Sequence, residues 1–419
     1  MISRFCFNIS IYKNLKNILK IFFFRDINYD EKLKKKLSII YNSSEFYFFD
    51  YGRTAFYEIL SQIKTKTNKR KVLINSLTLF EIINVIIYSG FEPVFIDTKK
   101  NSFQTSIDLN DYNKEINNIA VIVITHLNGA NENIINIKKQ IDNHNKNEEK
   151  IYLVEDCAVS FGSKFNEENV GCFGDYSFLS FNIMKNITCY TGGTLIDNDK
   201  NILSINKLKY MKLSKLGVLK KTLFIILIQF LNSIILFPIF FKFINYSYKN
   251  SFNFFLKRYR ADFEVKIENN FPLKFSFLMH PFQKKILITQ FDDFKEKQLS
   301  RIKKSKIYYN NLNEIDDIEF PQNEFTLKNT FLDFPILCKT LSIKNNLFNY
   351  LIEKKIDIKN YYYKNCAEEP IYNSSSTSCP NSMYVSQNIL MLPVHEKINE
   401  QHQHLIINEI RNFFKENTN

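Results

Sequence analysis

The stretch YSFLSFNIMKNITCYTGGTLID, residues 176–197, contains two short apolar runs, YSFLSF and GTLID, joined by a loop with one lysine and a pair of glycines. Short apolar runs bounded by turn residues are typical of strands buried on both faces of a sheet. Lys185 lies between Ser180–Phe181, which end the first run, and the glycines. The stretch therefore predicts two strands with a lysine in their connection.

Four similar runs precede this stretch. They are VLIN from residue 72, PVFID from residue 93, AVIVITH from residue 120 and IYLVED from residue 151. Helix-like segments separate several of them, and strands alternating with crossover helices are the pattern of an α/β sheet. We therefore expect a large α/β domain over residues 46–205.

Both ends of the chain differ from this pattern. Near the N-terminus, lysines interrupt the apolar residues at helical spacing and no small-residue cleavage site follows, which predicts an amphipathic helix and not a signal peptide. Residues 282–312 predict one long amphipathic helix, and strand-like and helix-like segments alternate after about residue 325. The expected organisation is a helical segment over 1–45, the large domain, an apolar insert with basic flanks over 206–265, and a small C-terminal α+β domain over 266–419.

Composition excludes several classes of protein. The chain has 419 residues, of which 45% are hydrophobic, so it can build a large core. Its formal net charge of +13 comes from lysines spread along the chain, which argues against a nucleic-acid-binding protein. Its seven cysteines are scattered without a C-x-x-C pair, so a disulfide scaffold is not expected and a reducing cytoplasm fits. The histidines lack partners at ligand spacing, and no metal is expected.

Polar residues near the ends of the predicted strands suggest a cofactor site. Asp156 ends the run YLVED, Gly52 starts a helix-like segment in DYGRTAFYEIL, and Ser180 lies five residues before Lys185. Pyridoxal phosphate needs a lysine for a Schiff base, a carboxylate beside its pyridine nitrogen, and hydroxyl and N–H groups for its phosphate. A helix N-terminus supplies such N–H groups. Each feature is common by itself, and only their order and spacing are specific.

The sequence resembles the DegT-type sugar aminotransferases, pyridoxal-phosphate enzymes of fold type I, over residues 46–415. The segments that carry this resemblance are THLNGA at 125, VEDCAVSFGSKF at 154, GCFGDYSFLSFNIMKNITCYTGG at 171, MHPFQKKILITQFDDF at 279 and ILMLPVHEKI at 389. The resemblance implies a mixed α/β seven-stranded sheet with a smaller C-terminal α+β domain, and the apolar residues 222–241 predict a helical insert in this chain.

The resemblance also implies roles for individual residues. Lys185 would form the Schiff base and move protons, and Asp156 would pair with the pyridinium nitrogen. Implied cofactor contacts are Gly52, Arg53, Thr54, Leu79, Asp156, Val159, Ser180 and Lys185. His126 and Asn186 are the candidates for substrate contact.

Several positions depart from the family pattern. Leu79 replaces an aromatic residue that stacks on the cofactor ring, and Val159 replaces a Gln or His that reaches it. Thr191 replaces a Glu, and Ser276 and Leu278 replace an Asn and an Arg, of which the Asn reaches the phosphate in the partner subunit. These departures affect the prediction of the substrate pocket more than the prediction of the cofactor.

The resemblance implies a homodimeric aminotransferase that converts a nucleotide-linked keto sugar to an amino sugar for surface polysaccharide, with glutamate as donor. The alternatives are a catalytically silent relative that acts as a binding or scaffold subunit, and a pyridoxal-phosphate sugar dehydrase.

The apolar residues 222–241 leave two alternatives open. They are long enough to cross a bilayer, but a crossing would separate the small domain from Lys185. Asn232–Ser233 divides them into two halves, so a helical hairpin in one leaflet is expected, and a buried helix or a dimer contact is the alternative. The basic flanks favour contact with the inner face of the cytoplasmic membrane.

Overall fold

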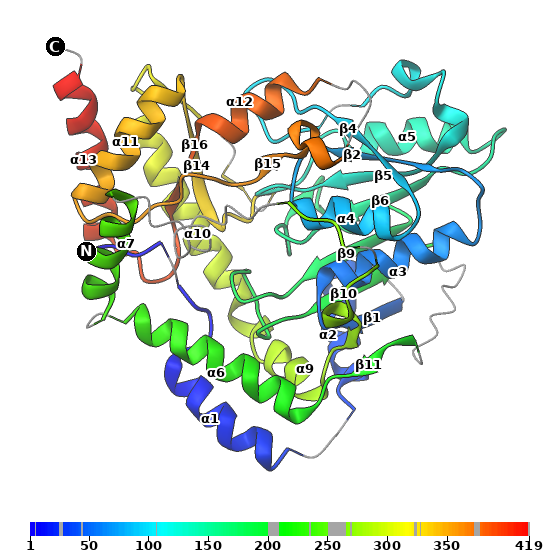
Figure 1. Ribbon diagram of the computed structural model, residues 1–419, viewed down its shortest axis with the longest axis horizontal. Helices are drawn as coiled ribbons and strands as arrows, with labels where there is room; N and C mark the ends of the chain where they lie inside the picture. Colours follow the sequence, from blue (N-terminus) through cyan, green and yellow to red (C-terminus); the bar gives the residue numbers. More distant parts are fainter. Residues whose placement is uncertain are drawn as a thin grey trace.

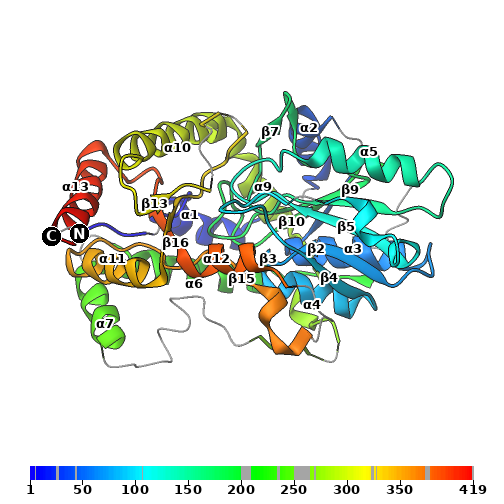
Figure 2. The same ribbon diagram turned by 90° about the horizontal axis from the view of Figure 1, so that it is seen from above.

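The computed structural model places a large sheet and a small sheet side by side, each covered by helices (Figures 1 and 2). It describes residues 1–4, 6–24, 28–42, 45–105, 107–199, 209–233, 236–249, 265–268, 270–321, 325–326, 328–372 and 378–417. Parts of the predicted insert and its basic flanks, residues 206–208, 234–235 and 250–264, lie outside these ranges. The predicted domain boundaries remain predictions.

The large sheet has the strand order β11-β12-β1-β10-β9-β6-β5-β2-β4. Its strands are β1 (Glu45–Phe49), β2 (Lys71–Asn75), β4 (Glu92–Ile96), β5 (Ile119–Thr125), β6 (Tyr152–Asp156), β9 (Tyr176–Ser180), β10 (Gly193–Asp197), β11 (Met211–Lys212) and β12 (Phe277–Leu278). From β4 to β9 all neighbours are parallel, and β10 is antiparallel to both β9 and β1. The seven longer strands give the predicted mixed sheet, and β11 and β12 extend it at one edge.

Burial explains why these strands could be predicted. Every residue of β5, IAVIVIT, is buried, and so is every residue of β6 and β10. Helices cover both faces of the sheet, so its strands have no polar side. On one face lie α3 (Gly52–Lys64) and α4 (Phe80–Tyr88), and on the other lie α2 (Asp30–Tyr41) and α5 (Ile134–His144) (Figure 2).

The small sheet, β13-β14-β16, is antiparallel. Its strands are β13 (Ile318–Glu319), β14 (Asp333–Cys338) and β16 (Ile389–Pro393). Helices α10 (Phe291–Leu312), α11 (Leu341–Glu353) and α13 (Glu400–Asn417) pack with this sheet around one apolar core, and α12 (Pro380–Asn388) leads into β16.

The prediction of one long helix over 282–312 is wrong, because two helices occupy these residues. Helix α9 spans Pro281–Ile288 and packs against α2 of the large domain, whereas α10 belongs to the small domain. Between them the amide of Gln290 bonds both backbone groups of Thr188, accepting from its N–H at 3.1 Å and donating to its carbonyl. This non-local contact holds the chain where it passes between the domains.

The apolar insert forms α6 (Lys215–Leu231) and α7 (Phe237–Lys249), and α1 (Ile11–Phe22) packs beside α6 (Figure 1). The residues before α1 pack against the small domain. Ile2 forms a β-bridge with Ile356, and Arg4 forms a buried ion pair with Asp357 at 2.9 Å. The described helices include none with the length and apolar character needed to cross a membrane.

Candidate active site

Lys185 lies in the loop that leads from β9 to β10, in a cleft at the carboxyl ends of β5, β6 and β9. Thr125 ends β5 and is paired in register with Asp156, which ends β6, and Ser180 ends β9. Ligands bind at this edge in open α/β sheets, because the side chains that end neighbouring parallel strands converge there. Thr125, Asp156, Ser180 and Lys185 all line the cleft.

Two groups of opposite charge, half-buried Lys185 and buried Asp156, determine the electrostatics of the cleft. Burial lowers the pKa of Lys185 from 10.5 to about 8, although the Asp156 carboxylate acts in the other direction. Burial raises the pKa of Asp156 to about 6, against the backbone N–H of Ala158 and the charge of Lys185, which both lower it. A neutral amine and an ionised carboxylate are therefore both accessible near pH 7. Opposed shifts of this kind mark acid and base sites.

The loop before α3 forms the end of the cleft that suits a phosphate. Gly52 begins α3, so the first N–H groups of that helix are available to an anion. A Cβ on Gly52 would lie 3.0 Å from the carbonyl of Leu179, and a Cβ on Gly193 would lie 2.3 Å from the nitrogen of Gly52. Glycine at both positions is what lets this loop lie directly on β9 and β10.

Arg53 lines the cleft, but its side chain already has partners. Its Nη1 lies 3.2 Å from Glu81 Oε1, and its guanidinium stacks on the Phe275 ring at 4.5 Å. The backbone of Arg53, not its side chain, is therefore placed toward the anion site in this structure.

A buried polar cluster supports this loop from behind. The amine of Lys221, on α6, forms an ion pair with Asp50 and donates to Thr191 Oγ1 at 2.7 Å. Gln283 donates to Asp50 Oδ1 at 3.0 Å and to the carbonyl of Thr191 at 2.7 Å. Thr191, one of the departures from the family pattern, thus joins the apolar insert to the residues that precede Tyr51 and Gly52.

The cofactor fits the donor set of the cleft. The Oγ1 of Thr125 is buried and has no hydrogen-bond partner among the described residues. Of the carboxylate oxygens of Asp156, Oδ1 accepts from the N–H of Ala158 at 2.9 Å. Leu79 and Val159 also line the cleft, so apolar surface is present where a ring would lie. A lysine, a buried carboxylate, a free hydroxyl and helix N–H groups are what pyridoxal phosphate requires.

Three predicted residues do not line the cleft. Thr54 is buried and donates from Oγ1 to the carbonyl of Phe275 at 2.6 Å. The side chain of Asn186 bonds the carbonyl of Thr330 and Arg301 Nη1, at 3.1 and 2.8 Å. The third, His126, belongs to the group described next.

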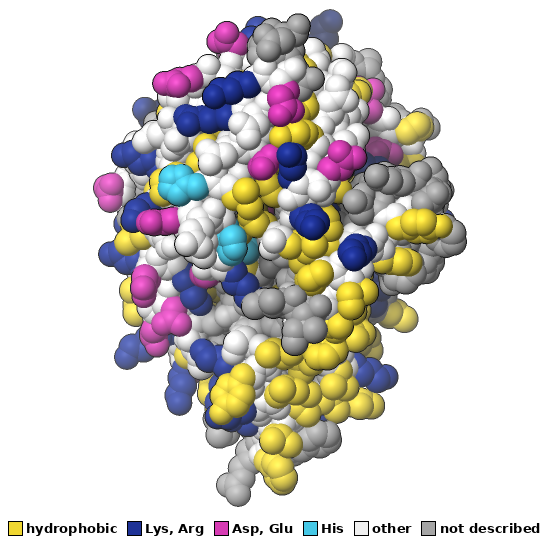
Figure 3. All heavy atoms as spheres, turned by 90° about the vertical axis from the view of Figure 1, so that its left-hand side faces the viewer, with side chains coloured by type: hydrophobic (Ala, Val, Ile, Leu, Met, Phe, Trp, Pro, Cys, Tyr) yellow, Lys and Arg dark blue, Asp and Glu magenta, His cyan; other side chains and the backbone are white. Residues whose placement is uncertain are grey.

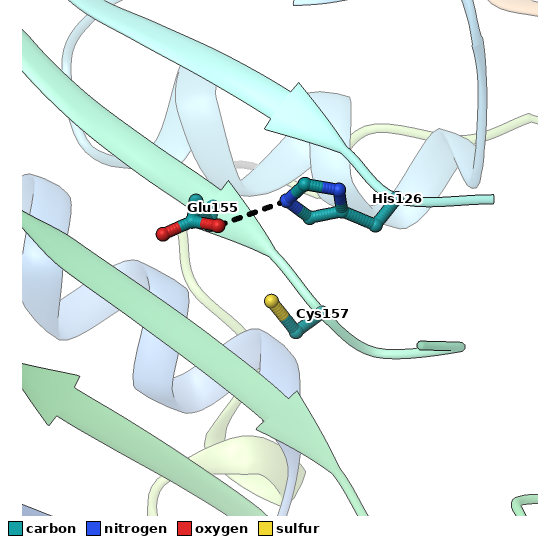
Figure 4. A group of neighbouring side chains, drawn as sticks. All are labelled: His126, Glu155 and Cys157. Atoms are coloured by element: carbon teal, nitrogen blue, oxygen red, sulfur yellow. Dashed lines mark hydrogen bonds and ion pairs between the residues drawn. The ribbon is translucent and has the colours of Figure 1, made fainter. Parts of the chain in front are cut away.

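His126, Glu155 and Cys157 form a buried group close to the cleft (Figure 4). The Nδ1 atom of His126 accepts from the N–H of Asn131 at 2.9 Å, so its Nε2 carries the proton that is shared with Glu155 at 3.0 Å. Glu155 also accepts from three backbone N–H groups between residues 171 and 174. These bonds give the group a structural role as it stands.

Several cleft residues have little or no signal in the sequence. Thr125 lies at the end of the predicted strand that precedes His126, and this position was the only sign that it could line the cleft. Tyr363 and Asn182 line the cleft from loops, and no local pattern marks them.

Known proteins resemble this chain in sequence and in structure. A profile of the DegT/DnrJ/EryC1/StrS aminotransferase family matches residues 52–223 and 251–411. The GDP-perosamine synthase of Escherichia coli O157:H7 is 34% identical over 136 residues, which are 32% of this chain and 35% of that protein. The GDP-perosamine synthase of Vibrio cholerae is 31% identical over 153 residues, 36% of this chain and 39% of that protein. The matched segment thus spans little more than a third of these curated relatives.

Solved structures match nearly the whole chain. The sugar aminotransferase CalS13 from Micromonospora echinospora has a TM-score of 0.72 at 14% identity and covers 98% of this chain and 100% of its own. The PLP form of Spr1654 from Streptococcus pneumoniae has a TM-score of 0.70 at 15% identity and covers 98% and 97%. At these identities the likeness shows the fold, and it confirms the predicted fold type I architecture. Because the profile covers well over half of the chain, the protein belongs to the DegT/DnrJ/EryC1/StrS aminotransferase family, as predicted, and its cofactor is pyridoxal phosphate.

Proposed function

We propose that this protein is an aminotransferase that converts a nucleotide-linked keto sugar to an amino sugar, with an amino acid such as glutamate as donor. The observation that carries the proposal is the pair of half-buried Lys185 and buried Asp156 in one cleft, with oppositely shifted pKa values. Two relatives named GDP-perosamine synthase and one named as a transaminase of a UDP-linked amino sugar support the substrate class.

Each residue of the cleft has a distinct task in this proposal. Lys185 would hold the cofactor covalently and, once released by the donor amine, move a proton to or from the reacting carbon. Its lowered pKa makes the neutral amine accessible near pH 7. Bound pyridoxal phosphate supplies an electron sink next to that carbon.

The other residues orient the cofactor. The Asp156 carboxylate would pair with the protonated ring nitrogen, whose positive charge would lower the pKa of Asp156 and keep it ionised. The Ser180 hydroxyl and the N–H groups at Gly52 and Arg53 would bind the phosphate.

The enzymatic test uses the purified full chain with cofactor. The chain is incubated with glutamate and a panel of GDP-, UDP- and dTDP-linked keto sugars, and both 2-oxoglutarate and the sugar product are measured. Equal amounts of 2-oxoglutarate and amino sugar would support transamination, and a deoxygenated sugar without a new amine would favour a dehydrase. No product from any substrate, with cofactor bound, would favour a catalytically silent relative.

Assembly and location complete the proposal. We propose a homodimer, because fold type I sites are completed at a subunit interface, as the resemblance implies. Ser276, in place of the Asn that would reach across, leads us to expect weaker hold on the phosphate. We also propose a place at the inner face of the cytoplasmic membrane, reached through residues 222–241, where amino sugars for surface polysaccharide would be used.

A further inference from the structure

Helices α1 and α6 lie side by side and run in opposite directions (Figure 1). At one end Asn14 Nδ2 donates to Gln229 Oε1 at 2.8 Å, and at the other end Lys215 Nζ donates to the carbonyl of Phe24 at 2.7 Å. Hydrogen bonds at both ends hold the two helices side by side, so their outer sides are adjacent.

Both sides of α6 carry apolar residues, although only the inner side is buried. The inner side buries Val218, Thr222, Ile225 and Gln229, at spacings of four, three and four residues. The outer side exposes five large apolar residues, each between 48% and 60% accessible, which are Leu216, Leu223, Phe224, Leu227 and Phe230. A helix at the surface of a soluble protein carries polar residues on that side.

Helix α1 continues the same apolar surface. Its exposed residues are Ile11, Tyr12, Leu15, Leu19 and, just after the helix, Phe23, which is 85% accessible. Ile239 of α7 is exposed as well. Figure 3 shows hydrophobic side chains gathered in the lower part of the face, where α1 and α6 lie, with lysine and arginine around them. Single exposed apolar residues are normal, whereas a continuous patch marks an interaction site.

The charge of this surface has one sign. Helices α1, α6 and α7 contain no Asp or Glu, whereas the whole chain has 43. Apart from Lys221, which pairs with Asp50 on the inner side, their described lysine side chains are Lys13, Lys16, Lys20, Lys215, Lys220 and Lys242. A second copy of the chain seated on this face by a two-fold axis would bring these positive charges together. An anionic lipid surface would instead attract the lysines and take up the apolar side chains.

We propose that the outer sides of α1 and α6, defined here as the α1–α6 face, bind the surface of an anionic membrane, with both helices in the plane of the headgroups. This deepens the membrane location proposed above and replaces insertion of a hairpin by shallow contact of two helices. The inner side of α6 stays on the protein, where Lys221 holds Asp50 behind the cofactor cleft. The cleft therefore remains on the aqueous side, open to a soluble nucleotide-linked substrate.

The absence of tryptophan from the chain makes a direct test possible. Phe23→Trp and Phe224→Trp each give the full chain one tryptophan, on α1 and α6 respectively, and Leu341→Trp gives one at an exposed site of the small domain. With vesicles of phosphatidylglycerol and phosphatidylcholine, we expect the emission of Phe23→Trp and Phe224→Trp to shift to the blue. Quenchers attached to the lipids should place both tryptophans at a similar, shallow depth. Leu341→Trp should not shift. A shift of Phe224→Trp alone would overturn the two-helix surface.

Co-sedimentation with the same vesicles tests the residues. We expect Leu19→Gln, Leu223→Gln and Leu227→Gln together to reduce binding by about tenfold or more, because three apolar side chains no longer leave water. A matched control, Ile39→Gln with Leu299→Gln and Leu341→Gln, changes three exposed apolar residues elsewhere and should bind as the parent does. Pure phosphatidylcholine, or high salt, should weaken binding.

Two outcomes would overturn the proposal. One is that the parent chain does not bind anionic vesicles. The other is that the parent chain is a dimer by light scattering and the triple variant of the face is a monomer, which would make the face a contact between copies. Transamination without vesicles is measured in parallel, so an inactive protein that binds vesicles contradicts the proposed function alone.

Discussion

Asp156→Asn should make the cofactor-free protein more stable while removing its function. The carboxyl is buried, and its pKa lies at about 6 instead of 3.8. An acid whose folded pKa is raised destabilises the fold above that pKa, and the penalty disappears as the pH falls below the unfolded value. A shift of about 2 units corresponds to about 3 kcal/mol at pH 7.5. An amide of the same shape does not pay this penalty.

The assay is urea unfolding of the cofactor-free parent and variant at several pH values. At pH 7.5 the variant should be more stable by up to about 3 kcal/mol, and the difference should shrink toward zero near pH 4. Asp142→Asn, which changes an exposed carboxylate on α5, is the control and should show no such pH-dependent gain. With cofactor added the order should reverse, because the amide cannot pair with a ring cation.

Two results would contradict the raised pKa of Asp156 or its role beside the cofactor. A variant that is less stable than the parent at pH 7.5 would mean that burial does not strain Asp156. A variant that binds cofactor normally and turns over at the parental rate would remove Asp156 from its proposed role.

Three further predictions concern the cleft. The rate at which added pyridoxal phosphate attaches to the cofactor-free protein should rise to about pH 8 and then level off, since the amine of Lys185 loses its proton there; a rate that climbs steadily to pH 10 in stopped-flow absorbance would argue against the lowered pKa. Gly193→Ala should abolish cofactor retention after gel filtration, because the new Cβ would lie 2.3 Å from the Gly52 nitrogen; full retention would show that the loop can move aside. Lys221→Met should speed the loss of cofactor in dialysis by about tenfold, because it removes a hydrogen-bonded charge behind the loop before α3. Lys220→Met changes an exposed lysine and should leave the rate of loss unchanged. Equal rates in both variants would show that Lys221 is dispensable.

Local pattern was sufficient where burial decides the structure. Strands β2, β4, β5, β6, β9 and β10 follow from their β-branched runs, since helices cover both faces of the sheet. The seventh long strand, β1, has the sequence EFYFF and follows directly on a helical segment, so its pattern alone did not separate it. The resemblance implied seven strands, but the position of this one was not predicted.

Long-range contacts explain what the sequence did not predict. The break between α9 and α10 depends on Gln290 bonding Thr188, which is 102 positions away. The pair of Lys221 with Asp50 joins residues 171 positions apart. Lys221 directly precedes the apolar segment, and nothing in the local sequence indicated that it supports the loop before α3. Asp156, Ser180 and Lys185 were predictable because strand ends and their spacing place them at one edge of the sheet. Tyr363 lies in a loop that no local pattern marks, so its place in the cleft follows only from the assembled fold.

Covalent trapping identifies the lysine that holds the cofactor, which we propose is Lys185. The purified full chain is loaded with pyridoxal phosphate, reduced with borohydride, digested and mapped by mass spectrometry. We expect one phosphopyridoxyl group in the parent, on Lys185, and none in Lys185→Ala, whereas Lys220→Ala should be labelled as the parent is. Labelling of a different lysine in the parent, or undiminished labelling of Lys185→Ala, would contradict this proposal.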